Sequence, residues 1–185
     1  MRKTLIELVS IHTPFDDLEN EHKNNTLLFL HQNGNCTSTD NLSGHVTASA
    51  WVLSPDNSET LLTHHRKLNR WLQLGGHIEN DSTIQKAALR EAKEESGMND
   101  MSLVSDKIFD IDVHIIPTNK KVLEHYHYDI RFLIQAKSTD FTKSLESNEL
   151  AWVKLTEVSD LVSDESVLRM CRKTSNVLPN DLSTR

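Results

Sequence analysis

The sequence predicts one α+β domain, with helices layered on a β-sheet. Its 185 residues fall in the usual length range of a single domain. Segments with helical periodicity alternate with strand segments that short turns separate, which is typical of hairpins packed against helices. Few of the connections are long enough for a crossover between parallel strands, so an α+β or layered α/β/α architecture is expected.

Two helices are expected before the first strand. Residues 2–11 carry apolar side chains at helical spacing, and Pro14 interrupts that spacing. Thr13 followed by Pro14 is typical of a helix start, which predicts a second helix that runs to about Leu30. Residues 31–44 are rich in Asn, Ser, Thr and Gly and therefore predict a loop.

Later segments of the chain predict strands and two further helices. The strand segments are, in chain order, residues 45–53, 60–65, 107–116, 124–136 and 151–155. Turn residues at 54–57 and 117–119 join the first two and the next two strands, so each pair is expected to form a hairpin. The helices are expected at residues 83–96 and 163–174.

The charge balance argues against a surface that binds duplex nucleic acid. Lys and Arg number 20 against 27 Asp and Glu, which gives a formal net charge of −7. Without a basic excess, side chains cannot neutralise phosphate groups over a wide surface. A protein this acidic needs a cation between itself and a phosphorylated ligand.

The termini and the cysteines predict a cytoplasmic protein that does not bind membranes. The apolar run after Met1 is short and contains Glu7, unlike a signal peptide, and no run approaches the roughly 18 residues of a membrane helix. Cys36 and Cys171 lie far apart in the sequence, and we expect both to be reduced thiols.

Three glutamates continue the apolar stripe of the helix expected at 83–96. At about 100° per residue and measured from Ile84, Glu91, Glu94 and Glu95 lie at about −20°, −80° and +20°. Like charges on one inward face repel each other and lose hydration, so positive charge is expected among them. Arg90 offers one cation, and a hard divalent ion with oxygen ligands offers another.

The ends of this helix also carry sequence signals. Ser82 with Gln85 predicts a capping box, and Gly97 predicts a left-handed C-terminal cap. Taken alone, the charge run is also typical of a solvated acidic helix. The pair Gly75 and Gly76, at a fixed distance before it, favours a functional motif.

Residues 76–98 resemble the signature of the Nudix hydrolases, G-x5-E-x7-R-E-U-x-E-E-x-G-U, where U is aliphatic. Gly76 matches the first glycine, and the dense second half matches throughout. The matching residues there are Arg90, Glu91, Ala92, Glu94, Glu95, Gly97 and Met98. Ser82 stands where the signature has its first glutamate, and we expect it to cap the helix while Glu79 replaces part of the charge.

The resemblance implies an α/β/α sandwich with a mixed sheet, over residues 44–160 of one domain that spans 1–185. Residues 1–43 would be an N-terminal helical extension, and residues 161–185 a C-terminal helix and tail. Whether the extension covers the pocket or forms a homodimer contact is left open.

The resemblance also implies metal-dependent hydrolysis of a diphosphate linkage in a small-molecule nucleotide, with Mg²⁺ or Mn²⁺ as cofactor. Nucleotide sugars, nucleoside triphosphates and dinucleoside polyphosphates are all open as substrates. The implied metal ligands are Glu91, Glu94, Glu95 and the backbone of Gly75. Arg90 would orient the glutamates, and the backbone of Gly75 and Gly76 would approach the metal and the phosphates.

Two further positions are candidates for the same site. Nudix enzymes often supply an extra glutamate as ligand or base, and Glu149 lies where that residue is found; the alternative is an exposed loop carboxylate. Arg66, Lys67 and Arg70 lie just before the glycines, where they would attract an anionic substrate.

Polar residues alternate along the strands expected at 107–116 and 124–136. They are Asp110, Asp112 and His114 on the first strand and His125, His127, Asp129 and Arg131 on the second. Three interpretations fit this face: the solvent side of a sheet, a substrate contact, or a second metal site. Between the last two we favour substrate contact by His125 and His127, with Asp112 and Asp129 helping the imidazoles to gain protons.

A second function remains open beside hydrolysis. The missing glutamate at Ser82 favours a catalytically weak nucleotide sensor or scaffold that retains the fold, whereas the three later glutamates favour an enzyme.

Overall fold

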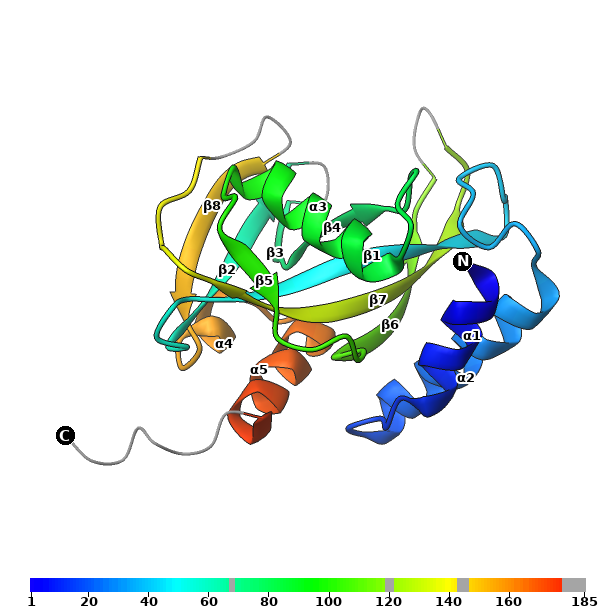
Figure 1. The fold of residues 1–185 in the computed structure, drawn as a ribbon, viewed down its shortest axis with the longest axis horizontal. Coiled ribbons are helices and arrows are strands. Elements are labelled where there is room, and N and C mark those ends of the chain that lie inside the picture. The colour runs from blue at the N-terminus through cyan, green and yellow to red at the C-terminus, as the bar shows by residue number, and fades with distance from the viewer. Residues whose placement is uncertain (67–68, 119–121, 143–146, 178–185) are drawn as a thin grey trace.

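The computed structural model describes residues 1–66, 69–118, 122–142 and 147–177, without the side chains of Ser147 and Val177. Figure 1 shows a central sheet with helix α3 on one face and helix α5 on the other. Two N-terminal helices, α1 and α2, pack side by side at one end of the sheet. The expected α/β/α arrangement with an N-terminal helical extension is confirmed.

The element bounds differ in places from those expected. The helices are α1 (Arg2–Ile11), α2 (Asp17–Gln32), α3 (Ile84–Ser96), α4 (Val158–Leu161) and α5 (Glu165–Val177). The strands are β1 (Gly44–Leu53), β2 (Glu59–His65), β3 (Arg70–Leu72), β4 (Leu74–His77), β5 (Met101–Leu103), β6 (Asp110–Ile116), β7 (His125–Ala136) and β8 (Ser147–Lys154). None of the described helices is long and apolar enough to cross a membrane.

Strand β1 lies at the centre of the sheet and is buried along its whole length. It pairs in parallel with β7, from Gly44 opposite Tyr126 to Leu53 opposite Gln135, and in antiparallel with β4. The hairpin expected between β1 and β2 is confined to its turn, where Leu53 pairs with Thr60. Beyond that pair β2 leaves β1 and pairs with β3 and β8.

The two faces of β1 pack against different helices, since successive side chains of a strand point to opposite faces. Ala48 and Ala50 belong to the clusters that also hold the α3 residues Ala87 and Ala92, and these small side chains let α3 approach the sheet. On the opposite face Trp51 packs in one cluster with Val167 and Met170 of α5. Its indole Nε1 donates a hydrogen bond to Thr174 Oγ1 at 2.9 Å.

The N-terminal helices share the main hydrophobic core. Leu5, Val9 and Phe29 pack in one cluster with residues of the sheet and of α3. Helix α2 begins later than predicted, because Asp16 rather than Thr13 is its cap and accepts a hydrogen bond from the Glu19 N–H at 2.8 Å.

Helix α3 ends as predicted but begins one residue late. Gly97 adopts the left-handed conformation (φ 67°) and its N–H donates to the Lys93 carbonyl, so the predicted C-terminal cap is confirmed. The predicted Ser82 cap is wrong, because Thr83 is the N-cap and its side chain accepts from the Lys86 N–H at 3.3 Å. The Gln85 amide donates to the Asp106 carbonyl at 3.0 Å and so lies outside any capping box.

Thr83→Ala is therefore expected to lower the free energy of unfolding by about 1 kcal/mol, the usual loss for an N-cap hydroxyl. Ser82→Ala, one residue earlier, is the matched control and should change it by less than half of that. Urea unfolding of both variants checks the assignment. An equal or larger loss of unfolding free energy in Ser82→Ala would show that Ser82 is the N-cap.

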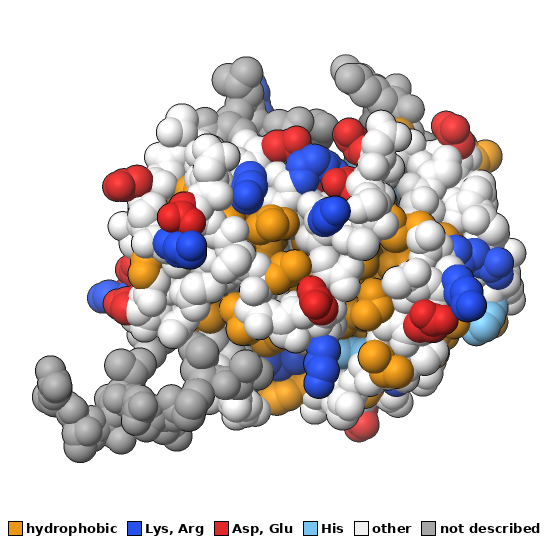
Figure 2. Space-filling view, viewed as in Figure 1, with side chains coloured by type: hydrophobic (Ala, Val, Ile, Leu, Met, Phe, Trp, Pro, Cys, Tyr) orange, Lys and Arg blue, Asp and Glu red, His pale blue; other side chains and the backbone are white. Residues whose placement is uncertain are grey.

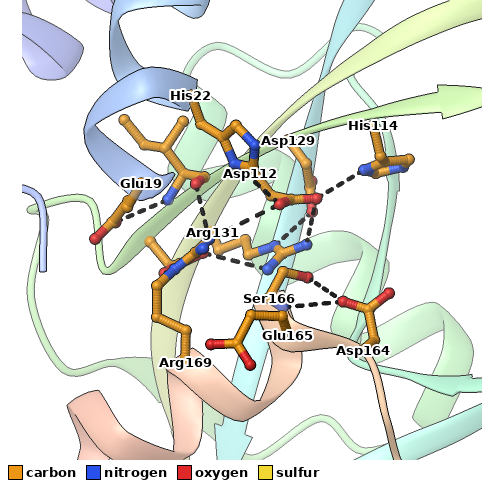
Figure 3. Close-up of polar contacts among 12 residues, drawn as sticks. Glu19, His22, Asp112, His114, Asp129, Arg131, Asp164, Glu165, Ser166 and Arg169 are labelled. Carbon is orange, nitrogen blue, oxygen red and sulfur yellow. Dashed lines mark hydrogen bonds and ion pairs between the residues drawn. The ribbon is translucent and has the colours of Figure 1, made fainter. Parts of the chain in front are cut away.

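The polar face of β6 and β7 is largely buried, which makes the solvent-side interpretation wrong for its charged residues. Figure 3 shows that α2 and α5 contribute side chains to an ion network on this face. The buried carboxylates of this network are Glu19, Asp110, Asp112 and Asp129, and the buried cations are Arg131, Arg169 and Lys173. Arg131 contacts carboxylate oxygens of Asp110, Asp112 and Asp129 at 2.8 to 3.2 Å. The network therefore ties both terminal segments to the sheet.

Glu19 makes the stability of this network depend on pH. Burial alone would raise the pKa of Glu19, but hydrogen bonds from His12 and Lys173, with the charge of Lys173, lower it from 4.5 to about 2. A carboxylate with a depressed folded-state pKa contributes stability above its unfolded pKa, and that contribution is lost as the pH falls.

We expect the free energy of unfolding to fall as the pH drops from about 4.5 towards about 2. Glu19→Gln should be less stable than the wild type at pH 7, and the difference between the two should shrink through that window. Urea unfolding at a series of pH values measures both. A difference that stays constant with pH would contradict the assignment.

Candidate active site

Strand β4 brings the glycine pair against α3. A Cβ on Gly76 would lie 2.6 Å from Glu91 Cδ, and one on Gly75 (φ +154°) would lie 2.2 Å from Ser49 Oγ. Glycine is thus required at Gly75 by contact and by conformation, whereas a side chain at Gly76 would displace the Glu91 carboxylate. The Gly75 N–H donates a hydrogen bond to Glu95 Oε2 at 3.1 Å, which fixes that carboxylate beside the turn.

Arg90 joins the remaining acidic groups. Its Nη1 donates to Glu91 Oε1 and to Glu94 Oε2, each at 2.9 Å, and its Nη2 donates to the His77 carbonyl at 2.8 Å. Its Nε and Nη2 also donate to Asp81, the latter at 3.0 Å. From the sequence, Glu79 was expected to replace part of the negative charge lost at Ser82. Asp81, which directly precedes Ser82 and pairs with Arg90, was missed.

Negative charge exceeds positive charge in this group. Burial raises the pKa of Glu91, and the nearby charges of Glu94 and Glu79 raise it further, while Arg90 acts in the opposite direction. One guanidinium therefore does not compensate the carboxylates around it. Carboxylate oxygens in this arrangement are the ligands that a hard divalent cation prefers, and such an ion would supply the missing positive charge.

An open hollow of about 380 Å³ lies next to Arg90 and Glu94 on the outer side of α3. Lys86, Leu89 and Lys93 complete its lining. Figure 2 shows basic and acidic side chains mixed over α3, so the surface beside the glutamates carries cations despite the acidic net charge.

Two residues expected at this site are exposed on or next to strands β2 and β8. Arg66 is exposed in the turn after β2, and Lys67 lies outside the described residues. Glu149 is exposed on β8, opposite His64 of β2. Among the described side chains, neither Arg66 nor Glu149 takes part in the hydrogen-bonded group around Arg90.

Histidines from three strands meet on the sheet face opposite α3. His45 of β1 pairs in register with His127 of β7, and His77 lies on β4, the other neighbour of β1. One ring nitrogen of each can be chosen so that all three lie within 4.8 Å of one another. Sequence reasoning missed His45 and His77. The signal for His45 was the polar alternation of His45, Thr47 and Ser49 along β1.

His45 and His127 are neutral at pH 7, and burial opposes the gain of protons that the sequence predicted for His127. Burial lowers the pKa of His45 to about 4 and that of His127 to about 2, and neighbouring imidazoles add to the effect. The carboxylates of Asp112 and Asp129 were expected to attract protons to these rings. Both are instead paired with Arg131, and Asp112 also contacts His22 and His114.

Comparison with known proteins agrees with this fold. Residues 44–170 match the sequence model of the NUDIX domain. A solved hydrolase of the NUDIX family from Clostridium perfringens is 24% identical with a TM-score of 0.55, and the match covers 72% of this chain and 98% of that chain. The C. elegans Ap4A hydrolase, in a binary complex, is 18% identical with a TM-score of 0.57, over 71% of this chain and 96% of that chain.

The E. coli dihydroneopterin triphosphate pyrophosphohydrolase has the same fold, at 14% identity and a TM-score of 0.53, over 72% of this chain and 96% of that chain. No curated protein matches this chain significantly. The structural likenesses show the fold, and the domain match covers more than half of the sequence. The chain therefore belongs to the Nudix hydrolase family.

Proposed function

We propose that this protein hydrolyses a diphosphate linkage in a nucleoside diphosphate derivative and that the reaction depends on Mg²⁺ or Mn²⁺. The observation that carries the proposal is that the Gly75 N–H binds the Glu95 carboxylate while Arg90 links Glu91 and Glu94 on the same helix. The described side chains there offer carboxylate oxygens whose charge is incompletely balanced, which suits a hard divalent ion.

The proposed ligands are the side chains of Glu91, Glu94 and Glu95 and the backbone of Gly75. When bound, the ion would neutralise the phosphates and polarise the phosphorus centre that water attacks. Glu95 is oriented by the Gly75 N–H, and Glu91 by Arg90. The Glu94 side chain is 59% exposed, so it is the carboxylate of the three most open to solvent and substrate.

Other residues are assigned to the substrate and to the attacking water. Gly75 and Gly76 present backbone without side chains, which permits close approach of a phosphate. Arg66 would attract the anionic substrate, and His125, whose ring is part-exposed at the edge of the histidine group, would contact it by hydrogen bonding. Glu149 is the proposed additional carboxylate for activating water or binding metal.

The structural relatives support a substrate with linked phosphates. Their names record activity on Ap4A and on dihydroneopterin triphosphate, which are both nucleotide-like compounds with phosphoanhydride bonds. By this comparison dinucleoside polyphosphates and nucleoside triphosphates are proposed as substrates beside nucleotide sugars.

A panel of these three substrate classes, each assayed with Mg²⁺, with Mn²⁺ and with a chelator, tests the proposal. We expect metal-dependent cleavage of at least one class, and ³¹P NMR of products made in H₂¹⁸O identifies the phosphorus that water attacks. Saturable nucleotide binding without cleavage of any phosphate bond would support the sensor function instead.

A further inference from the structure

We propose that His45, His77 and His127 form a second metal site, for a divalent transition metal such as Zn²⁺, on the sheet face opposite the glutamates of α3. The three imidazoles are supplied by adjacent strands in the order β4, β1 and β7. Strand positions hold ligands more rigidly than loops do, so the site is largely preformed.

The spacing of the three rings is close to that of histidines bound to one metal ion. Their ring centroids lie 4.7 Å apart for His45 and His127, 5.0 Å for His45 and His77, and 5.6 Å for His77 and His127. Zinc–nitrogen bonds of about 2.0–2.1 Å in a tetrahedron place ligand atoms roughly 3.3 Å apart. The ligand atoms here lie within 4.8 Å of one another, so modest side-chain rotations bring them to that spacing.

An unsatisfied histidine provides a second, independent observation. His45 is 2% exposed, and neither its Nδ1 nor its Nε2 has a hydrogen-bond partner among the described residues. A buried imidazole without partners lowers stability, because its polar atoms lose water and gain nothing in return. A metal bound to one nitrogen would satisfy that group where the surrounding protein does not.

The donor set distinguishes this site from the carboxylates of α3. Neutral imidazole nitrogen suits Zn²⁺, Ni²⁺ and Cu²⁺, whereas Mg²⁺ prefers the oxygen ligands of Glu91, Glu94 and Glu95. The two sites are therefore expected to bind different metals. The proposal reassigns His127 from substrate contact to metal ligand.

Neighbouring histidines are oriented as in known metal sites. The His125 Nδ1 lies 2.8 Å from the Leu123 carbonyl, and the His114 Nδ1 lies 2.9 Å from Asp112 Oδ2. Both partners accept hydrogen bonds, so each Nδ1 carries the proton and each Nε2 keeps its lone pair. Metal-binding histidines are commonly fixed in this way. His125 Nε2 lies 3.3 Å from His127 Nε2, so His125 borders the proposed site.

The proposed site is joined to the glutamate group through the backbone. His77 follows Gly76, and its carbonyl accepts the hydrogen bond from Arg90 Nη2 at 2.8 Å. A metal on the His77 ring would hold this end of β4 against β1 and β7. It would thereby fix the carbonyl that helps to position Arg90.

Zinc binding to the full chain tests the proposal directly. Metal-free protein is titrated with Zn²⁺ in millimolar Mg²⁺ against a chromophoric chelator, and Co²⁺ is used in parallel because its visible spectrum reports nitrogen coordination. We expect one Zn²⁺ per chain and a rise in melting temperature with Zn²⁺. His45→Gln and His127→Gln should each weaken Zn²⁺ binding by at least about 100-fold, since loss of a residue that only orients a ligand already lowers metal affinity by about 10- to 100-fold.

Two control variants separate this site from other metal binding. His31→Gln changes an exposed histidine of α2 and should leave Zn²⁺ affinity unchanged. Glu95→Gln should also leave Zn²⁺ affinity unchanged, although the proposed function predicts that this variant loses hydrolytic activity. Failure of the hydrolase proposal is thus distinguishable from failure of the zinc proposal.

Absence of saturable Zn²⁺ binding by the wild type would overturn the site whether or not the variants fold. So would unchanged affinity in folded His45→Gln and His127→Gln, or loss of binding in Glu95→Gln alone. Circular dichroism establishes which variants are folded.

Discussion

Glu95→Gln is expected to lower kcat by at least about 100-fold while the melting temperature stays close to that of the wild type. Glutamine keeps the size of the side chain, and its carbonyl can still accept the hydrogen bond from the Gly75 N–H. It removes the negative charge that a divalent ion requires of its ligands. Mutation of groups that only orient metal ligands typically lowers metal affinity or activity by about 10- to 100-fold. Loss of a ligand should therefore lower activity by at least the upper end of that range.

Steady-state kinetics at increasing Mg²⁺ concentration measure this effect. Loss of a ligand weakens metal affinity, so part of the activity should return at high Mg²⁺. Glu7→Gln, which changes an exposed carboxylate of α1 in the same way, is the matched control and should hydrolyse at the wild-type rate. Wild-type kcat and unchanged Mg²⁺ dependence in Glu95→Gln would refute the ligand assignment.

Helix α3 could be predicted because its signals are local. The apolar stripe, the cap at Gly97 and the spacing of Glu91, Glu94 and Glu95 lie within one short segment. The N-cap was misplaced by one residue because Ser82 and Thr83 are both good caps, and the backbone conformation of the loop chooses between them. Strands β3, β4 and β5 were missed because three or four residues are too few to establish a period.

The histidine site depends on pairings that no local pattern contains. His45, His77 and His127 meet because β1 pairs in parallel with β7 and in antiparallel with β4. The sequence favoured a hairpin of β1 with β2 instead, since a short turn between two strands is the strongest local signal for pairing. Only the observed register places β1 between the two strands that carry the other histidines.

The ion network was misjudged for a different reason. Alternation along β6 and β7 correctly placed Asp110, Asp112, Asp129 and Arg131 on one face, and such a face is usually solvated. Here α2 and α5 cover it and bring complementary charges, among them Arg169. Periodicity identifies which residues share a face, but the packing of helices distant in the sequence decides whether that face is exposed to solvent.

Arg169→Met is expected to lower the free energy of unfolding by about 3 kcal/mol. The Arg169 side chain is fully buried, and its Nε and Nη2 donate to the two oxygens of Asp110 at 2.8 and 2.9 Å. Methionine fills similar space but leaves Asp110 with less compensating charge, and breaking one partner of a buried ion pair costs about 3–5 kcal/mol. Asp110 keeps its contacts with Arg131 and Lys173, which places the expected loss at the lower end.

Arg172→Met provides the matched control three residues later on the same helix. The Arg172 side chain is 45% exposed and pairs with Glu165, and exposed ion pairs contribute only about 0–1 kcal/mol. Urea unfolding of both variants at pH 7 gives the two losses on one scale. A loss of about 3 kcal/mol is a large part of the 5–15 kcal/mol typical of a domain, so Arg169→Met should also unfold at clearly lower temperature. Equal losses in the two variants would mean that the Arg169 ion pair contributes no more to stability than a surface pair does.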